Sequence, residues 1–213
     1  MISDFESILI DTMAGIVEQK SGATDDHVIR TRIFMQIMLE AMVDADIYGD
    51  EMKGVCIQTA SKASQLHDLG KISIDSNVLQ KQGSLTDAEF ELVKNHTAVG
   101  GEIIGNMMNK VPASKFLEYA KIIAESHHEC WDGGGYHKGL VGEEIPILGR
   151  VMAIADVYDA LVTKRPYKEA FSHTKAVEII KNDGGVHFDP TLVQLFLQVH
   201  EKFEQIVNGA SEN

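Results

Sequence analysis

Two pairs of adjacent polar side chains in this sequence have types and spacing that could support metal chemistry. His67 and Asp68 stand together in QLHDLGK, and Lys71 follows at a spacing that lets all three approach one helical face. His127 and His128 stand together in ESHHECWDGGGYHKG. Adjacent helical side chains diverge by about 100°, so two such imidazoles serve one site only at a helix end or between two cations. The alternative for QLHDLGK is a solvated polar patch at a helix end.

Asp156 is the sharpest single signal, because its surroundings in VMAIADVYDAL are almost entirely apolar. A carboxylate in such a run is costly unless it is paired or bound to a cation. Asp159 lies three residues further on and shares the same helical face. In the structural alternative, the two aspartates cap loops or pair with Arg150 or Arg165.

Two further histidines are weaker candidates when each is considered alone. His27 follows two acidic residues at the start of a predicted helix, and His96 lies in the helical pattern KNHTAVGGEII. Imidazole and carboxylate ligands together suit iron, manganese or zinc. Seven candidate donors are too many for one tetrahedral ion and predict a pair of divalent ions, with Asp68 as the natural bridge. The seven are His27, His67, Asp68, His96, His127, His128 and Asp156.

Composition excludes several classes of protein. The chain has 213 residues, of which 44% are hydrophobic, so it can bury one sizeable core. A formal net charge of -13 opposes generic binding to DNA or RNA polymers. No apolar run reaches the length of a membrane span, and the start MISDFESILID lacks the basic region of a signal peptide. The expectation is a cytoplasmic protein that does not enter membranes.

The elements that must position these residues are predicted from apolar spacing and capping signals. Alternating apolar runs are absent, so the predicted fold class is all-α, a helical bundle around a metal centre with no significant sheet. Residues 1–213 are expected to form a single domain, on which residues 1–22 pack as an N-terminal helix. The segment 71–84 is expected to be a loop. Helices are predicted over about 5–17, around 33–39, over 51–69, after 86, over 112–128, over 145–162, after 172 and from 190 onward.

The motifs taken together resemble the HD-GYP domain, a branch of the HD phosphohydrolase superfamily that includes cyclic di-GMP phosphodiesterases. The resemblance extends from about residue 17 to residue 196. It rests on His27-x-x-Arg30, HDLGK at 67–71, His96, HHECWDGGGYHKGL, IPILGRVMAIADVYDALVTKRPYK and GGVHFDP at 184–190.

The resemblance implies an all-helical fold in which the seven candidate donors hold two divalent ions, iron or manganese first among them. It implies hydrolysis of cyclic di-GMP to linear pGpG, with further cleavage to GMP left open, by a metal-bridged hydroxide that attacks phosphorus. Asp68 and Lys71 would be catalytic, and Asp159 would orient a ligand histidine. The substrate contacts implied are Lys71, Arg165, Lys168, Gly135 and Tyr136.

Two positions depart from the family pattern. Members with three metals tend to carry a Glu four residues before the first ligand histidine, where this chain has Ala23, and this favours two metals. The Gly-Tyr-Pro triplet reads Gly135-Tyr136-His137, which frees the backbone and adds an imidazole.

Other functions stay open on the sequence alone. The same site could act on another cyclic dinucleotide or on a nucleotide phosphate. A non-catalytic signalling module would instead use the Gly-rich segment to bind a diguanylate cyclase or another protein. The apolar stripe from Phe5 to Val17 could also be a homodimer seam, although packing on the chain's own core is favoured.

Overall fold

The computed structural model describes residues 4–22, 26–164 and 169–210, which are helical apart from short connections. Across these ranges the only β pairing is an isolated bridge between Gly184 and Phe188, so the predicted all-α fold is confirmed. None of the helices in these ranges combines the length and the apolar character that crossing a bilayer requires. With η denoting a 3-10 helix, the elements are α1 (Asp4–Ser21), α2 (Asp26–Asp44), α3 (Gly49–Met52), α4 (Ile57–Ala63), η1 (Ser64–Leu66), η2 (Leu69–Ser73), α5 (Ser76–Leu79), α6 (Asp87–Lys94), α7 (His96–Met108), α8 (Lys115–Ser126), η3 (Gly142–Glu144), α9 (Ile147–Val162), α10 (His173–Asn182) and α11 (Pro190–Ala210).

Side-chain caps set the starts of several helices. Thr86 and Glu89 form a complete capping box at α6. Ser172 accepts a hydrogen bond from the backbone of Lys175 at the start of α10. The predicted start at Pro112 is wrong by three residues, because Ser114 caps α8 and Pro112 lies in the preceding turn.

The predicted helix over 51–69 is also wrong, since this segment divides into α3, α4 and η1. Gly54 adopts a φ of 81°, which a right-handed helix cannot continue through. The segment 71–84, predicted as a loop, contains part of η2 and the short α5, which Asp75 caps. His67 and Asp68 therefore lie at a junction of two 3-10 helices rather than within one long helix.

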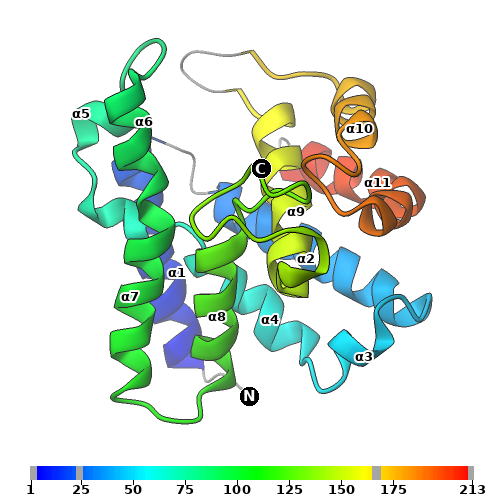
Figure 1. Cartoon of the computed structure of the whole chain (residues 1–213), viewed down its shortest axis with the longest axis horizontal. Coiled ribbons are helices and arrows are strands. Elements are labelled where there is room, and N and C mark those ends of the chain that lie inside the picture. Colours follow the sequence, from blue (N-terminus) through cyan, green and yellow to red (C-terminus); the bar gives the residue numbers. More distant parts are fainter. Residues whose placement is uncertain (1–3, 23–25, 165–168, 211–213) are drawn as a thin grey trace.

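The helices form two groups that meet along α9 and α2. In Figure 1, α7 and α8 lie side by side with α1 behind them, and α10 and α11 lie on the other side of α9. Aromatic rings join α2, α9 and α11: the Phe34 ring stacks on Phe203 at 4.3 Å and meets Tyr158 edge-on at 5.3 Å. This core fixes α2 and α9, each of which carries candidate donors.

Backbone contact without intervening side chains fixes η2 on α7. Gly70 in η2 lies directly over the backbone of His96 and Gly100, and a Cβ on Gly70 would stand 1.9 Å from the carbonyl oxygen of His96. This close approach brings the start of α7 next to Asp68.

Candidate metal centre

Seven side chains from distant parts of the chain converge between the two groups of helices. We call them the histidine–carboxylate cluster: His27, His67, Asp68, His96, His127, His128 and Asp156. Each sits near the end of an element except Asp156, which lies within α9. His127 and His128 directly follow α8, and this position at a helix end lets both reach one centre despite being adjacent.

The cluster divides into two sets of donor atoms. Ligand atoms of Asp68, His96, His127 and His128 lie within 4.8 Å of one another, and so do those of His27, His67 and Asp156. In the first set, His96 Nε2 is 3.2 Å from Asp68 Oδ1. In the second, His27 Nε2 is 3.6 Å from Asp156 Oδ1. His67 and Asp68, adjacent in the chain, connect the two sets.

Four imidazoles are oriented by a hydrogen bond from Nδ1. His67, His96 and His127 donate to the carbonyl oxygens of residues 64, 93 and 123, at 2.9, 2.6 and 3.0 Å. His27 Nδ1 donates to Asp159 Oδ2 at 2.7 Å. Because Nδ1 carries the proton in each ring, Nε2 presents its lone pair to the centre. This arrangement is typical of metal-ligating histidines.

Unpaired polar atoms at the centre fit a bound cation. His67 Nε2 and Asp68 Oδ1 are buried and have no hydrogen-bond partner among the described residues. The Nε2 atoms of His96 and His127 face each other at 3.3 Å, although both rings place their proton on the opposite nitrogen. Facing lone pairs and a buried carboxylate oxygen are costly without a positive charge between them. The donor set therefore fits divalent metal ions.

The electrostatics favour the ligating states of Asp68, His127 and His128 but not that of His67. Burial alone would raise the pKa of Asp68, but Lys71 and His67 hold this pKa well below its usual range. Burial lowers the pKa of His127 and, more strongly, that of His128. Burial also favours neutral His67, but the charge of Asp68 outweighs it and raises the His67 pKa to about 9. In the metal-free protein, a proton on His67 thus supplies part of the charge that a cation would bring.

Asp159 holds His27 from behind and is itself held by a buried arginine. Its Oδ1 accepts from Arg30 Nε at 2.6 Å, and its Oδ2 accepts from Arg30 Nη2 at 3.0 Å. Burial alone would raise the pKa of Asp159, but hydrogen bonds from His27 and Arg30 lower it. Neither Asp159 nor Asp156 takes Arg150 as a partner; Arg150 instead binds Glu51 and Asp189.

We expect Asp159→Asn to weaken Mn²⁺ binding to the protein by about 10- to 100-fold, because the His27 ring loses the carboxylate that orients it. The free energy of unfolding should also fall by about 3 kcal/mol, since Arg30 loses its buried partner. Calorimetric titration of metal-free protein measures the first effect. Thr163→Val is the control: it removes a 3.2 Å acceptor of Arg30 without touching His27. Equal metal affinity in Asp159→Asn and the parent would contradict this role.

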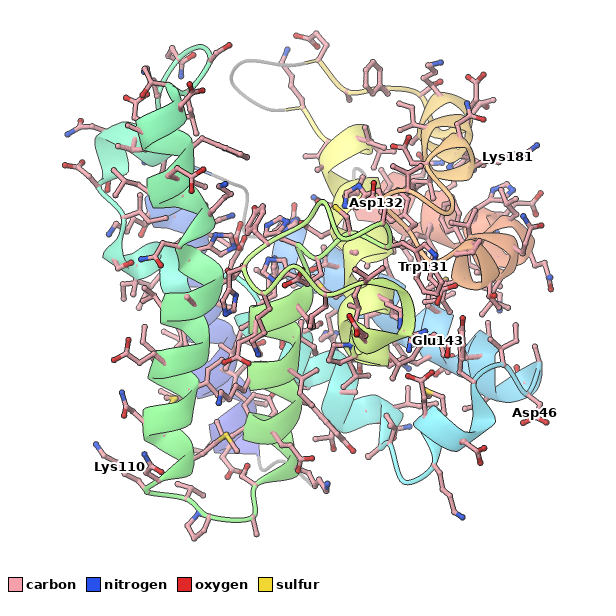
Figure 2. All side chains as sticks on the ribbon, in the orientation of Figure 1. Asp46, Lys110, Trp131, Asp132, Glu143 and Lys181 are labelled. Carbon is pink, nitrogen blue, oxygen red and sulfur yellow. The ribbon has the colours of Figure 1, made fainter. Side chains whose placement is uncertain are left out.

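The Gly-rich segment after α8 is a tightly held turn that presents Tyr136 to the cluster. The backbone N–H of Tyr136 donates to the His128 carbonyl at 3.0 Å, and the two rings stack at 4.8 Å. A Cβ on Gly135 would stand 2.2 Å from the backbone nitrogen of Cys130, so only glycine fits. The Glu129 carboxylate accepts from two backbone N–H groups further along, at 2.7 and 3.0 Å. Figure 2 shows Trp131 and Asp132 on this segment.

A cavity of about 870 Å³ opens onto the cluster. Lys71, Tyr136 and Lys164 are among the residues that line it, and Lys71 forms an ion pair with Asp68. Arg165 and Lys168, predicted to contact phosphate, lie outside the described residues, as does Ala23. His137 is exposed and belongs to neither donor set.

Sequence reasoning missed Glu18 and His187, which also line this cavity. Glu18 is only 1% exposed, although it lies on α1, one turn after the buried Ala14. A carboxylate that continues the buried face of an amphipathic helix is the signal that could have found it.

The fold and the cluster define a class: an all-helical protein whose imidazoles and carboxylates converge beside one cavity in an arrangement that could bind metal. A family model described as HD domain matches residues 38–192. The chain belongs to the HD domain family, and its similarity to the relatives below confirms the HD-GYP resemblance drawn from its motifs.

A cyclic di-GMP phosphodiesterase of Vibrio cholerae is 42% identical over 199 residues, which cover 93% of this chain and 40% of the relative. A 3'3'-cGAMP-specific phosphodiesterase of the same organism is 36% identical over 195 residues, which cover 92% of this chain and 35% of the relative. A solved structure of a V. cholerae cyclic GMP-AMP-specific phosphodiesterase superposes with a TM-score of 0.59 at 19% identity, over 92% of this chain and 49% of that chain. At that identity the superposition supports the fold alone. The chain spans less than half the length of each of these three proteins.

Proposed function

We propose that this chain is a metal-dependent phosphodiesterase that hydrolyses a cyclic dinucleotide, with cyclic di-GMP as the preferred substrate and linear pGpG as the product. The observation that carries the proposal is the convergence of four Nε2 lone pairs and two carboxylates in one buried cluster beside a cavity. The names of relatives at 36–42% identity support the substrate class. Divalent ions in such a site would lower the pKa of a water molecule and stabilise charge on the departing oxygen.

The chain's own residues supply binding and orientation. Lys71 lines the cavity beside Asp68, so its ammonium can neutralise a non-bridging phosphate oxygen. Tyr136 offers a ring face at the cavity wall, on which a guanine base can stack. Arg165 and Lys168 remain predicted phosphate contacts. A cavity of about 870 Å³ is large enough to enclose most of a dinucleotide.

The native metal, location and partners are further parts of this proposal. The cluster contains imidazoles and carboxylates but no thiolate, which favours iron or manganese over metals that prefer sulfur. The cytoplasmic location, the homodimer and the diguanylate cyclase partner stay predictions from the sequence.

Turnover by the purified, Mn²⁺-loaded protein tests the proposed function. We expect hydrolysis of cyclic di-GMP to pGpG, with at least about 10-fold lower kcat/KM for 3'3'-cGAMP, a difference of about 1.4 kcal/mol. Chromatography of the products from both substrates and from simple nucleotides measures this. Faster turnover of 3'3'-cGAMP would reassign the substrate. Absence of turnover of any cyclic dinucleotide, with metal demonstrably bound, would reject the enzyme in favour of a binding module.

A further inference from the structure

Helix α1 is apolar on two opposite faces, and the chain's own core covers only one of them. The inward face packs on η1 and η2 and buries Ile10, Ala14 and Val17. On the outward face, apolar residues recur every three or four positions and so lie along one side of the helix. With Thr12 they form the outer stripe, in which Phe5 is 75% exposed, Ile8 64%, Leu9 49% and Ile16 55%. An exposed apolar stripe of this kind marks a contact with another molecule.

A groove runs beside the outer stripe, between α1 and the start of α2. Its volume is about 460 Å³, and Gly15, Val28 and Ile29 are among the residues that line it. A Cβ on Gly15 would meet no atom within 4 Å, so the groove is open at this position. Of the described residues that line the groove, Asp11 alone is charged, and Lys62 already pairs with its carboxylate at 2.6 Å. The groove can therefore receive apolar side chains without burying an unpaired charge.

The outer stripe of one copy of the chain is complementary to the groove of a second copy. An antiparallel pair of α1 helices centred on Thr12 sets Leu9 of one copy opposite Gly15 of the other. The same pairing sets Ile8 opposite Ile16. A large side chain thus meets the position that has none, and the two-fold axis repeats each contact. A parallel pair would set Leu9 against Leu9 and leave both grooves empty.

We propose that the outer stripe and the adjoining groove form the interface of a symmetric, antiparallel homodimer. Four large apolar side chains of the stripe and that of Ile29, which is 48% exposed, become covered in each copy. Each buries about 100 Å², so the two copies together bury about 1,000 Å², the lower limit for a specific interface. The dimer should accordingly dissociate in the micromolar range. This inference goes beyond the proposed function and uses neither the metal centre nor the substrate.

Charge argues against two other occupants of this surface. A helix that binds membranes carries an excess of Lys and Arg beside its apolar face. The flanks of the outer stripe carry Glu6 and Asp11 as well as Lys20, and the whole chain has a net charge of -13. A strongly charged protein partner would find no uncompensated charge in the groove, because Lys62 neutralises Asp11. Two copies of the chain repel each other through their net charge, so the dimer should tighten as salt screens this repulsion.

Sedimentation velocity of the full chain, at about 1 to 100 µM, tests the interface. The parent should form a dimer as its concentration rises, with a dissociation constant that falls several-fold between low and high salt. Ile16→Glu should weaken the dimer by at least about 10-fold, because a symmetric interface contains the substitution twice. Val43→Glu is the matched control and should behave as the parent does. Val43 is also 55% exposed, but it lies at the end of α2 remote from the groove.

Cross-linking tests the antiparallel arrangement. Cys56→Ser first removes an exposed thiol from the background. A mixture of Ile8→Cys and Ile16→Cys chains should then cross-link more efficiently than either variant alone.

A parent chain that stays monomeric over the whole concentration range would overturn the proposal, including one that binds lipid vesicles instead. A folded Ile16→Glu that dimerises as the parent does would overturn it as well, and so would cross-linking that does not increase in the mixture. The measurements are independent of catalysis. A dimer that hydrolyses no cyclic dinucleotide would refute the proposed function and leave this inference standing.

Discussion

Asp68→Asn should lower kcat for cyclic dinucleotide hydrolysis by at least about 10³-fold, because loss of the central carboxylate removes several kcal/mol of metal-dependent stabilisation. Asp68 belongs to the first donor set, lies next to His67 of the second, and also faces Glu18. The substitution keeps the shape of the side chain but removes its charge, so imidazole lone pairs and cations lose their shared anion. Steady-state kinetics with saturating Mn²⁺ measures the effect, and metal analysis of the same samples should show fewer ions per chain.

A matched control distinguishes the effect of losing a carboxylate at the centre from the effect of losing one negative charge elsewhere on the protein. Asp44→Asn removes one carboxylate from the exposed end of α2 and should leave both kcat and the metal content unchanged. An Asp68→Asn protein that keeps more than about a tenth of the parent activity would show that Asp68 is not a bridging ligand.

Gly70→Ala should reduce the free energy of unfolding by about 3 kcal/mol or more, the largest stability effect expected from a single methyl group in this chain. The added Cβ would stand 1.9 Å from the His96 carbonyl oxygen and 2.6 Å from the Gly100 nitrogen. Both atoms belong to the backbone of α7, so no side-chain rotation relieves the overlap. η2 must move away from α7, and Asp68 moves with it. Urea denaturation of the metal-free variant measures the loss.

A substitution by alanine should instead raise the free energy of unfolding at a glycine where an added Cβ makes no close contact. Gly15 lies within α1, and a Cβ there would meet nothing within 4 Å. Gly15→Ala should stabilise the protein by about 1 kcal/mol, because alanine favours the helix. Similar stabilities of Gly70→Ala and the parent would mean that η2 and α7 do not pack through their backbones.

The fold class followed from the sequence because helix periodicity and caps are local. Thr86 and Ser172 cap α6 and α10 through hydrogen bonds to residues three positions further along the chain. Such short-range partners can be recognised in the sequence itself. The helix predicted over 51–69 failed because its division depends on the backbone of Gly54 and on packing against α8. The spacing of apolar residues continues through Gly54 and therefore does not predict that the helix is interrupted there.

The candidate site was predictable as a set of residue types but not as a geometry. Asp156 was identifiable from its apolar sequence context, and His127 was identifiable from its pairing with a second histidine. Glu18 was not, because α1 reads as an ordinary amphipathic helix and only tertiary packing shows which face is buried. The Glu129 carboxylate and the His128 carbonyl hold the Gly-rich segment in place, and composition does not encode these contacts.

The spread of the histidine–carboxylate cluster along the chain has a consequence for biosynthesis. Its members run from His27 to Asp156, and Asp159 must follow before His27 has its hydrogen-bond acceptor. A ribosome therefore has to translate the chain through Asp159 before the pocket can assemble. Any polypeptide released earlier, by premature termination or proteolysis ahead of α9, carries orphan imidazoles and cannot complete the centre.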